Sequence, residues 1–290
     1  MKKLSVILSM FVFMLVPLAV LAGSYSSIVA FGDSLSDNGG DDGYGFGTFS
    51  NGSVWVEYLA DSNHLNCDLY DYAFGGATTG TDYPDLNWQV DQYLLYNQSI
   101  ADGTLFTLWA GGNDFLGLGA GDDPYQAVMD AVLGMGLAVS KLVGAGAQDI
   151  LVMTLPNLGA TPLNNTDPAA SIGAQMITEA YNAALVEAMA GFDALPNVNL
   201  TSLDVFAILE DILDDPTKFG FDNVTDMLIA AGETTDAYLF CDAIHPTTQA
   251  HELIADYANT AVAPVPEPAT LLLLFSGLIG FAGFRKRFKK

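Results

Sequence analysis

Hydrophobic and polar positions divide the chain into two kinds of segment. Short apolar runs with the length and composition of buried strands are separated by longer stretches in which apolar residues recur at helical spacing. The apolar runs predict strands at 27–31, 69–73, 105–109, 150–154 and 198–203. The helical spacing predicts helices at 54–61, 87–97, 124–143, 169–189, 205–213 and 247–259.

The order of these segments predicts the fold class. Strands separated by long helices pair in parallel through right-handed crossovers, so we expect an α/β fold: a three-layer α/β/α sandwich of about five parallel strands. We find no sequence sign of an internal repeat or a second domain. Glycine-rich loops at 41–48 and 75–85 follow expected strand ends, which is where ligands bind in such sheets.

The first expected strand breaks abruptly at Gly32-Asp33-Ser34. A serine at such a turn presents its hydroxyl clear of the sheet, near backbone N–H groups and the start of a helix, where negative charge is stabilised. Ser34 is therefore a candidate nucleophile. Taken alone, the same residues are more typical of a helix N-cap.

Four carboxylates follow this strand, at Asp33, Asp37, Asp41 and Asp42. Their spacing does not match a calcium-binding EF-hand loop, so we interpret them as cap and loop residues and expect no metal site. The glycine-rich stretches lack the lysine and spacing of nucleotide-binding motifs. We expect no cofactor.

A serine nucleophile needs a base, and the chain has three histidines. His245 follows Asp242 by three residues and precedes Pro246, which disfavours helix, so we expect its imidazole on a loop within reach of the Asp242 carboxylate. His64 lies in a polar run and is expected at the surface. His251 falls inside the last helical pattern and is expected on the helix face.

Acyl transfer also needs hydrogen-bond donors for the oxyanion that forms on the attacked carbonyl. Gly76 ends an expected strand, and its missing side chain lets a carbonyl oxygen approach the N–H. Asn113 follows two glycines at another strand end and offers a side-chain amide. Each residue taken alone is also an ordinary turn residue.

Four sequence blocks occur in a recognisable order: Phe31-Gly32-Asp33-Ser34-Leu35-Ser36-Asp37, Tyr72-Ala73-Phe74-Gly75-Gly76-Ala77-Thr78-Thr79, Gly111-Gly112-Asn113-Asp114 and Asp242-Ala243-Ile244-His245-Pro246-Thr247. Together they resemble the GDSL (SGNH) hydrolases, a family of serine esterases and lipases. Residues 49–60 resemble the segment after the first block in the lecithinase- and phospholipase-like branch. The resemblance covers nearly all of the chain between its termini.

The resemblance implies a flavodoxin-like fold and a catalytic triad of Ser34, Asp242 and His245. It also implies an oxyanion hole formed by Ser34, Gly76 and Asn113. The chain departs from the family pattern at Asp71, where asparagine is frequent. It departs again at Cys241, where an aromatic or small residue is common. Neither change removes a catalytic group, but both affect the shape of the pocket.

Charge is distributed unevenly along the 290 residues. The chain has 9 basic and 34 acidic residues and a net charge of −25, and only Lys141 and Lys218 among the basic residues lie between residues 23 and 263. Such a domain repels nucleic acid and anionic membranes. This charge serves solubility in a salty or crowded exterior, or alternatively favours neutral substrates.

The two ends of the chain have the composition of targeting segments. Residues 1–22 are typical of a signal peptide, 23–260 form the expected hydrolase domain, 261–268 a proline-rich linker, 269–284 a transmembrane helix and 285–290 a basic cytoplasmic tail. The Val-Pro-Glu-Pro-Ala-Thr stretch before the helix resembles a PEP-CTERM sorting signal. That resemblance implies export by a Gram-negative bacterium to the periplasm, surface or matrix, transient inner-membrane anchoring and a sorting protease as partner.

Two cysteines complete the candidate chemistry. Cys67 precedes the second expected strand and Cys241 precedes Asp242, and we expect both near the carboxyl-end edge of the sheet. An exported chain with an even cysteine count is compatible with one disulfide. Two separate buried thiols are the alternative.

These features predict an exported serine esterase or lipase that hydrolyses carboxylic esters through an acyl-enzyme. A deacetylase of exopolysaccharide is the alternative enzyme. A non-catalytic surface or matrix protein on the same scaffold is the alternative class, against which the intact set of candidate residues argues: Ser34, Gly76, Asn113, Asp242 and His245.

Overall fold

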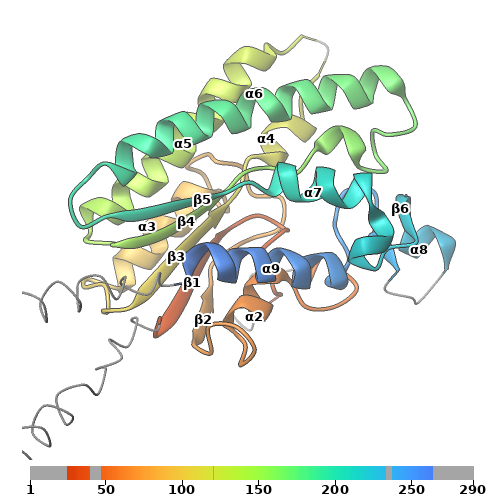
Figure 1. Ribbon diagram of the computed structural model, residues 1–290. Helices are drawn as coiled ribbons and strands as arrows, with labels where there is room; N and C mark the ends of the chain where they lie inside the picture. Colours follow the sequence, from red (N-terminus) through yellow and green to blue (C-terminus); the bar gives the residue numbers. More distant parts are fainter. Residues whose placement is uncertain (1–24, 40–46, 120, 233–236, 264–290) are drawn as a thin grey trace, which may run out of the picture. The chain divides into compact units, whose positions relative to one another are not determined.

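A computed structural model describes residues 25–39, 47–119, 121–232 and 237–263. Its centre is a sheet in the order β2-β1-β3-β4-β5 in which every neighbouring pair is parallel (Figure 1). The strands are β1 (Ser27–Gly32), β2 (Asp68–Asp71), β3 (Thr104–Trp109), β4 (Asp149–Met153) and β5 (Asn199–Leu203). The predicted fold class and the five parallel strands are confirmed.

Burial along the strands follows their place in the sheet. All six residues of β3 are buried, as is every residue of β1 after Ser27, because helices cover both faces of these inner strands. In the edge strand β2, exposed positions alternate with partly buried ones. The inner strands are therefore the continuous apolar runs that the sequence makes easiest to recognise.

Helices cover the two faces of the sheet and give the predicted three layers (Figure 1). On one face α5 (Pro124–Gly144) packs between α3 (Leu86–Tyr96) and α6 (Pro168–Asp193). On the other face α2 (Trp55–Ala60) packs against α9 (Thr248–Val262). The remaining long helix, α7 (Val205–Asp214), follows β5.

The two longest helices begin in the same way. The Asp123 carboxylate accepts hydrogen bonds from the first backbone N–H groups of α5, and Asp167 does so for α6. Each aspartate is followed by proline. Proline has no backbone N–H, and at the first helical position no helical hydrogen bond is lost, because an N–H there has no acceptor within the helix. These caps fix where both helices start.

The strand order places the site. The chain moves from β1 outward to β2, then returns past β1 to β3 and continues in the other direction. The loops after β1 and β3 therefore diverge and leave a crevice at the carboxyl edge, the usual ligand position in sheets of this order.

Several short elements were not predicted from the sequence: the parallel pair β6 (Asn223–Met227) and β7 (Tyr238–Phe240), the helices α4 (Gly112–Leu116) and α8 (Leu228–Ala231), and turns of 3₁₀ helix at Leu158–Ala160 and Pro216–Phe219. Each is three to five residues long, and β6 has no apolar alternation. Such short elements are stabilised by contacts with neighbouring segments, so their own residues show little hydrophobic periodicity from which to predict them.

Residues Tyr25–Val262 form one compact unit. The predicted signal peptide, transmembrane helix and basic tail lie outside the described residues, as do Asp41, Asp42 and all but 261–263 of the predicted linker. The domain boundaries at 23 and 260 stay a prediction.

Candidate active site

Ser34 lies at the turn that ends β1. A Cβ atom on Gly32 would collide with the Trp109 carbonyl oxygen of β3, so only glycine allows the two strands to approach this closely. The Asp33 carbonyl then accepts hydrogen bonds from the N–H groups of Ser36 and Asp37, both at 3.0 Å. This tight turn holds Ser34 at the switch point, with 7% of its surface exposed.

A buried glutamine, Gln89, holds the Gly32-Asp33-Ser34 turn through hydrogen bonds to the backbone of Gly32. The Gln89 side-chain oxygen accepts from the Gly32 N–H at 2.9 Å, and its amide donates to the Gly32 carbonyl at 2.8 Å and to Pro84 at 2.9 Å. Gln89 lies in α3 and is fully buried. Sequence analysis assigned it no role, because a single polar residue in a helical pattern does not reveal such a contact.

The structure brings His245 between Ser34 and Asp242. The His245 Nε2 atom lies 2.8 Å from the Ser34 Oγ, and its Nδ1 atom lies 2.7 Å from the Asp242 Oδ2. The other Asp242 oxygen accepts from the N–H groups of Ile244 at 2.9 Å and His245 at 2.8 Å. The Asp242 carboxylate therefore does two things: it holds the backbone of the loop that carries His245, and it orients the His245 imidazole.

The hydrogen bonds to Asp242 also set its charge. Partial burial raises the pKa of this carboxyl, but the bonds from the His245 imidazole and from the two backbone N–H groups outweigh it, and the net pKa lies below its usual value. The carboxylate is therefore ionised at neutral pH.

Of the predicted oxyanion donors, Gly76 lies on the loop after β2, and Asn113 lies in the short helix α4 that follows β3. The Asn113 side-chain amide donates to the Ala77 carbonyl at 2.9 Å, which fixes its orientation and leaves its second N–H for another acceptor. Gly76, directly before Ala77, has a φ of 83°, a conformation that favours glycine. The Gly75 N–H donates to the Asp37 carboxylate at 2.8 Å, which ties this loop to the serine turn.

Two further carboxyls lie beside the site. Asp114 accepts from the Thr79 hydroxyl at 2.8 Å and from the Thr79 N–H, and so joins α4 to the loop after β2. Burial raises the pKa of Asp33 to about 7; the Asp114 charge adds to this, whereas the Leu35 N–H and His245 lower it. Asp114 follows Asn113 directly, which is the only sequence feature that points to it.

A small cleft opens over these groups. Ser34, Asn113 and His245 line it together with apolar side chains from four segments at this edge of the sheet: Leu35, Leu116, Leu155, Pro156, Leu158 and Ile244. The polar groups therefore converge at one end of a largely apolar cleft.

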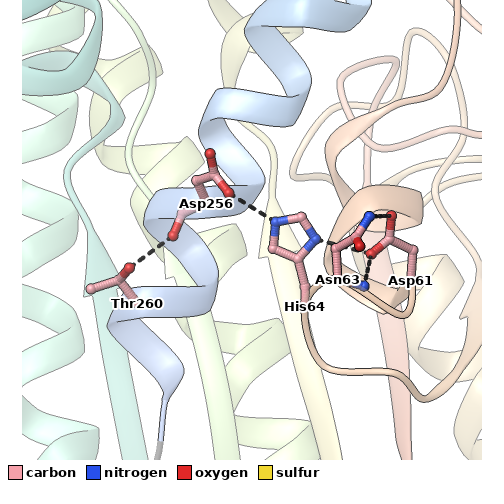
Figure 2. Close-up of polar contacts among 5 residues, drawn as sticks. All are labelled: Asp61, Asn63, His64, Asp256 and Thr260. Carbon is pink, nitrogen blue, oxygen red and sulfur yellow. Dashed lines mark hydrogen bonds and ion pairs between the residues drawn. The ribbon is translucent and has the colours of Figure 1, made fainter.

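The two other histidines lie elsewhere. His251 lies in the last helix as predicted, but on its buried face, and the side chain of His64 is largely buried although a surface position was expected. The His64 side chain is 6% exposed because α9 covers it, and its ring nitrogens contact Asp61 and Asp256 (Figure 2). His251 lies on the buried face of α9 with no exposed surface, where its Nδ1 accepts from the Trp55 N–H at 3.3 Å. Burial, with a smaller contribution from His245, lowers the pKa of His251 to about 3.

The expected position of Cys67 was wrong, and of the two alternatives for the cysteines the structure has separate thiols. Cys67 and Cys241 are both free thiols. Asp68 pairs with Ser27, so Cys67 lies at the amino end of the sheet, whereas Cys241 lies beside Asp242 at the carboxyl edge. The prediction overlooked that a residue before a parallel strand lies at the opposite edge from a residue after one.

The fold and the site define a class of protein, an α/β protein with a parallel sheet and a serine at its topological switch point. The family model for GDSL-like lipase/acylhydrolase matches residues 28–258, and the chain therefore belongs to this family of ester-hydrolysing enzymes. The PEP-CTERM protein-sorting motif matches residues 264–287. This motif indicates export in a Gram-negative bacterium with membrane anchoring.

The chain is similar to two bacterial proteins over most of its length. The chain is 28% identical over 268 residues to the thermolabile hemolysin of Vibrio parahaemolyticus, covering 80% of this chain and 62% of the hemolysin. It is 30% identical over 244 residues to the phosphatidylcholine-sterol acyltransferase of Aeromonas hydrophila, covering 76% of this chain and 70% of that enzyme. The chain thus spans less than two thirds of the hemolysin.

Solved structures share the fold. An acetylxylan esterase from Geobacillus stearothermophilus, in a catalytic mutant, aligns with a TM-score of 0.55 at 16% identity over 83% of this chain and 95% of that one. An α/β hydrolase from the metagenome of Lake Arreo aligns with a TM-score of 0.53 at 20% identity over 83% and 97% of the two chains.

Proposed function

We propose that the chain is an exported serine esterase whose catalytic triad is Ser34, His245 and Asp242 and whose reaction passes through an acyl-enzyme. The observation that carries this proposal is the unbroken series of contacts from Asp242 Oδ2 through the imidazole to Ser34 Oγ. A hydroxyl with this neighbour can lose its proton as it attacks.

The tautomer of His245 follows from its partners. The ionised Asp242 can only accept, so the Nδ1 atom carries the hydrogen and the Nε2 lone pair faces the Ser34 hydroxyl. As the Ser34 Oγ bonds to the ester carbonyl carbon, Nε2 takes the hydroxyl proton. The resulting imidazolium lies beside the Asp242 carboxylate, which stabilises its charge.

The negative charge on the carbonyl oxygen then needs donors. We assign the backbone N–H groups of Ser34 and Gly76 and the second side-chain N–H of Asn113. Donors held in place before the reaction stabilise this charge without reorganising. The bond from Asn113 to Ala77 supports the assignment, because it fixes the amide before substrate binds.

The remaining steps use the same groups. The imidazolium of His245 gives its proton to the leaving alcohol oxygen as the ester C–O bond breaks, leaving an acyl group on Ser34. A water molecule then gives its proton to Nε2 and attacks the acyl carbon, and a second collapse releases the acid and restores the Ser34 hydroxyl.

The location of the enzyme forms part of the proposal. We assign residues 1–22 as a signal peptide, 23–260 as the hydrolase domain and 269–284 as a membrane anchor processed near the Pro-Glu-Pro motif by a sorting protease. The PEP-CTERM match supports this arrangement. The name of the Aeromonas hydrophila relative, a phosphatidylcholine-sterol acyltransferase, favours a neutral carboxylic ester as substrate.

Hydrolysis of p-nitrophenyl esters by the full chain tests the proposal. Wild type should release p-nitrophenol, and Ser34→Ala should lower kcat by about 10⁴-fold or more with an unchanged melting temperature. Equal rates in the two proteins would refute the assignment, and hydrolysis of none of the esters by a folded protein would refute the function.

A further inference from the structure

A cavity of about 310 Å³ opens at the amino edge of the sheet, the edge opposite Ser34. Its volume is at the lower end of the range of small-molecule sites. The starts of three strands line it, with Ser27 of β1, Asp68 of β2 and Thr104 of β3. The segment 97–101, which follows α3, lines it from the side. We call this cavity the amino-edge pocket.

The amino-edge pocket lies where α3 ends. The Asn97 side-chain amide donates to the Tyr93 carbonyl in the last turn of α3 at 2.9 Å, and the helix stops there. Asp68 and Tyr70 lie on one face of the edge strand β2, since alternate strand residues share a face, and both are exposed. Because Ser27 and Asp68 are paired in the sheet, the strands hold the pocket in shape without a ligand.

Three tyrosines give the amino-edge pocket an aromatic side. Tyr70 is 53% exposed, and the ring of Tyr72 packs edge to face against that of Tyr93, with the ring centroids 5.6 Å apart. No hydrogen bond joins any of the three phenol hydroxyls to another described residue, and none of these oxygens is sealed from the surface. Each hydroxyl can therefore donate to a ligand and accept from it.

The rest of the lining is mostly polar and contains no cation. Serine, threonine and asparagine side chains lie beside the tyrosines, and Asp68 is the one charged residue that lines the pocket. Lys141 and Lys218, the only basic residues between 23 and 263, do not line it. An anionic ligand would meet the Asp68 carboxylate and the net negative charge of the domain, so the pocket favours a ligand without negative charge.

The mixture of rings and hydroxyls indicates the class of ligand. A hydrocarbon would take water from these polar groups and give them no hydrogen bond in return. A quaternary ammonium ion would use the rings and the carboxylate but none of the hydroxyls. A sugar uses both, because the C–H groups of one face of its ring pack on the electron-rich face of a tyrosine while its hydroxyls donate and accept around the edge.

We propose that the amino-edge pocket binds a neutral saccharide, one or two rings of an oligosaccharide or polysaccharide, packed on Tyr70. The inference goes beyond the proposed function, because Ser34 takes no part in it. The six residues of β1 separate the pocket from Ser34 by roughly 20 Å. The pocket thus holds the enzyme on a polysaccharide and leaves the cleft at Ser34 open to its ester.

Titration calorimetry of the full chain with cellotetraose, xylotetraose and mannotetraose tests the proposal. At least one of these neutral tetrasaccharides should bind, and Ser34→Ala should bind it with the same affinity. Tetragalacturonate should bind at least about tenfold more weakly, because its carboxylates meet like charge. Choline chloride serves as the probe for a cation site.

Variants locate the binding. Tyr70→Ala removes an exposed ring and should weaken saccharide binding about tenfold or more, whereas Tyr70→Phe keeps the ring and should stay within about threefold of wild type. Tyr72→Phe removes one hydroxyl and should weaken binding about two- to tenfold. Tyr125→Ala, which removes an exposed tyrosine outside the pocket, should bind as wild type does. Melting temperature and p-nitrophenyl acetate hydrolysis should be unchanged in Tyr70→Ala.

The outcomes separate this site from the proposed function. Full-strength saccharide binding by Tyr70→Ala, loss of that binding in Ser34→Ala, or no binding of any of the three neutral tetrasaccharides would overturn the saccharide site. Choline binding that Tyr70→Ala abolishes, with no saccharide bound, would overturn it in favour of a cation site. A folded chain that binds the saccharide and hydrolyses no ester would instead overturn the proposed function alone.

Discussion

Two segments of the chain share the pattern Asp-x-x-His, Asp61 to His64 and Asp242 to His245. In both, the aspartate accepts from the N–H two residues later, at 2.7 Å from Asn63 and 2.9 Å from Ile244. In both, an aspartate oxygen faces the histidine Nδ1, at 3.1 Å in the first and 2.7 Å in the second. The local geometry is nearly the same.

The segments differ in what meets the second ring nitrogen. The Nε2 atom of His64 lies 3.0 Å from the Asp256 carboxylate of α9 (Figure 2), whereas that of His245 lies 2.8 Å from the Ser34 hydroxyl. Burial lowers the pKa of His64, but its bonds to Asp256 and Asp61 outweigh burial, and the net pKa is raised. His64, between two carboxylates, favours the charged imidazolium and joins Asp61 to Asp256; we call this ion-pair cluster the charged clamp. His245, which faces a hydroxyl, can act as a base.

The largest expected effect separates the two histidines. His245→Ala should lower kcat by about 10⁴-fold or more, and the double variant with Ser34→Ala should lose little beyond that, because triad members act as a unit. The matched variant His64→Ala should keep kcat within about twofold, because its ring contacts only structural carboxylates. Ester hydrolysis measures both, and equal losses would mean that the base was misassigned.

The two aspartates give the next test. Asp242→Asn should lower kcat by roughly 10² to 10⁴-fold, because the amide no longer favours the tautomer with hydrogen on Nδ1. Asp61→Asn should leave kcat unchanged and lower the melting temperature slightly. Steady-state kinetics beside thermal melts checks the pair; a larger kinetic defect in Asp61→Asn would contradict the comparison.

An asparagine lies near each histidine, and only one has a proposed role in the reaction. Asn113→Ala should lower kcat by about 10² to 10³-fold, roughly 3 kcal/mol of transition-state stabilisation, with KM nearly unchanged. Asn63→Ala, which removes an amide beside the Asp61 carboxylate, should change neither constant. An Asn113→Ala variant altered in KM alone would make this residue a substrate-binding group.

The smallest expected effect is the pH dependence of the free energy of unfolding. The pKa of His64 is higher in the folded state than its ordinary 6.5, so the clamp contributes stability that is fully present below about pH 6.5 and is lost as pH rises through the folded-state pKa. Because Asp256 is mostly exposed, the contribution should be about 1 kcal/mol or less.

Comparison of wild type with His64→Gln measures this contribution. The difference in unfolding free energy should be greatest near about pH 6 and should shrink as the medium becomes alkaline. Asp256→Asn should remove much of the same pH dependence. A difference that grows with rising pH would contradict the charged clamp.

Structure could be predicted from the sequence where a residue's partners are close in the chain, or where it belongs to a long continuous apolar segment. β1 and β3 are continuous apolar runs because helices cover both faces, and Pro246 after His245 marks a loop. The partners of His64, His251 and Gln89 were not predictable in this way, because Asp256, Trp55 and Gly32 meet them only across the fold.

Covalent labelling tests the central claim most directly. A fluorophosphonate phosphorylates the serine oxygen that attacks it and loses fluoride, so the full chain should gain one adduct. Chymotryptic peptides suit its mapping, because trypsin finds only Lys141 and Lys218 between residues 23 and 263. We predict the adduct on Ser34, with none in Ser34→Ala and strongly slowed labelling in His245→Ala. An adduct on another residue, or labelling that persists in Ser34→Ala, would contradict the account.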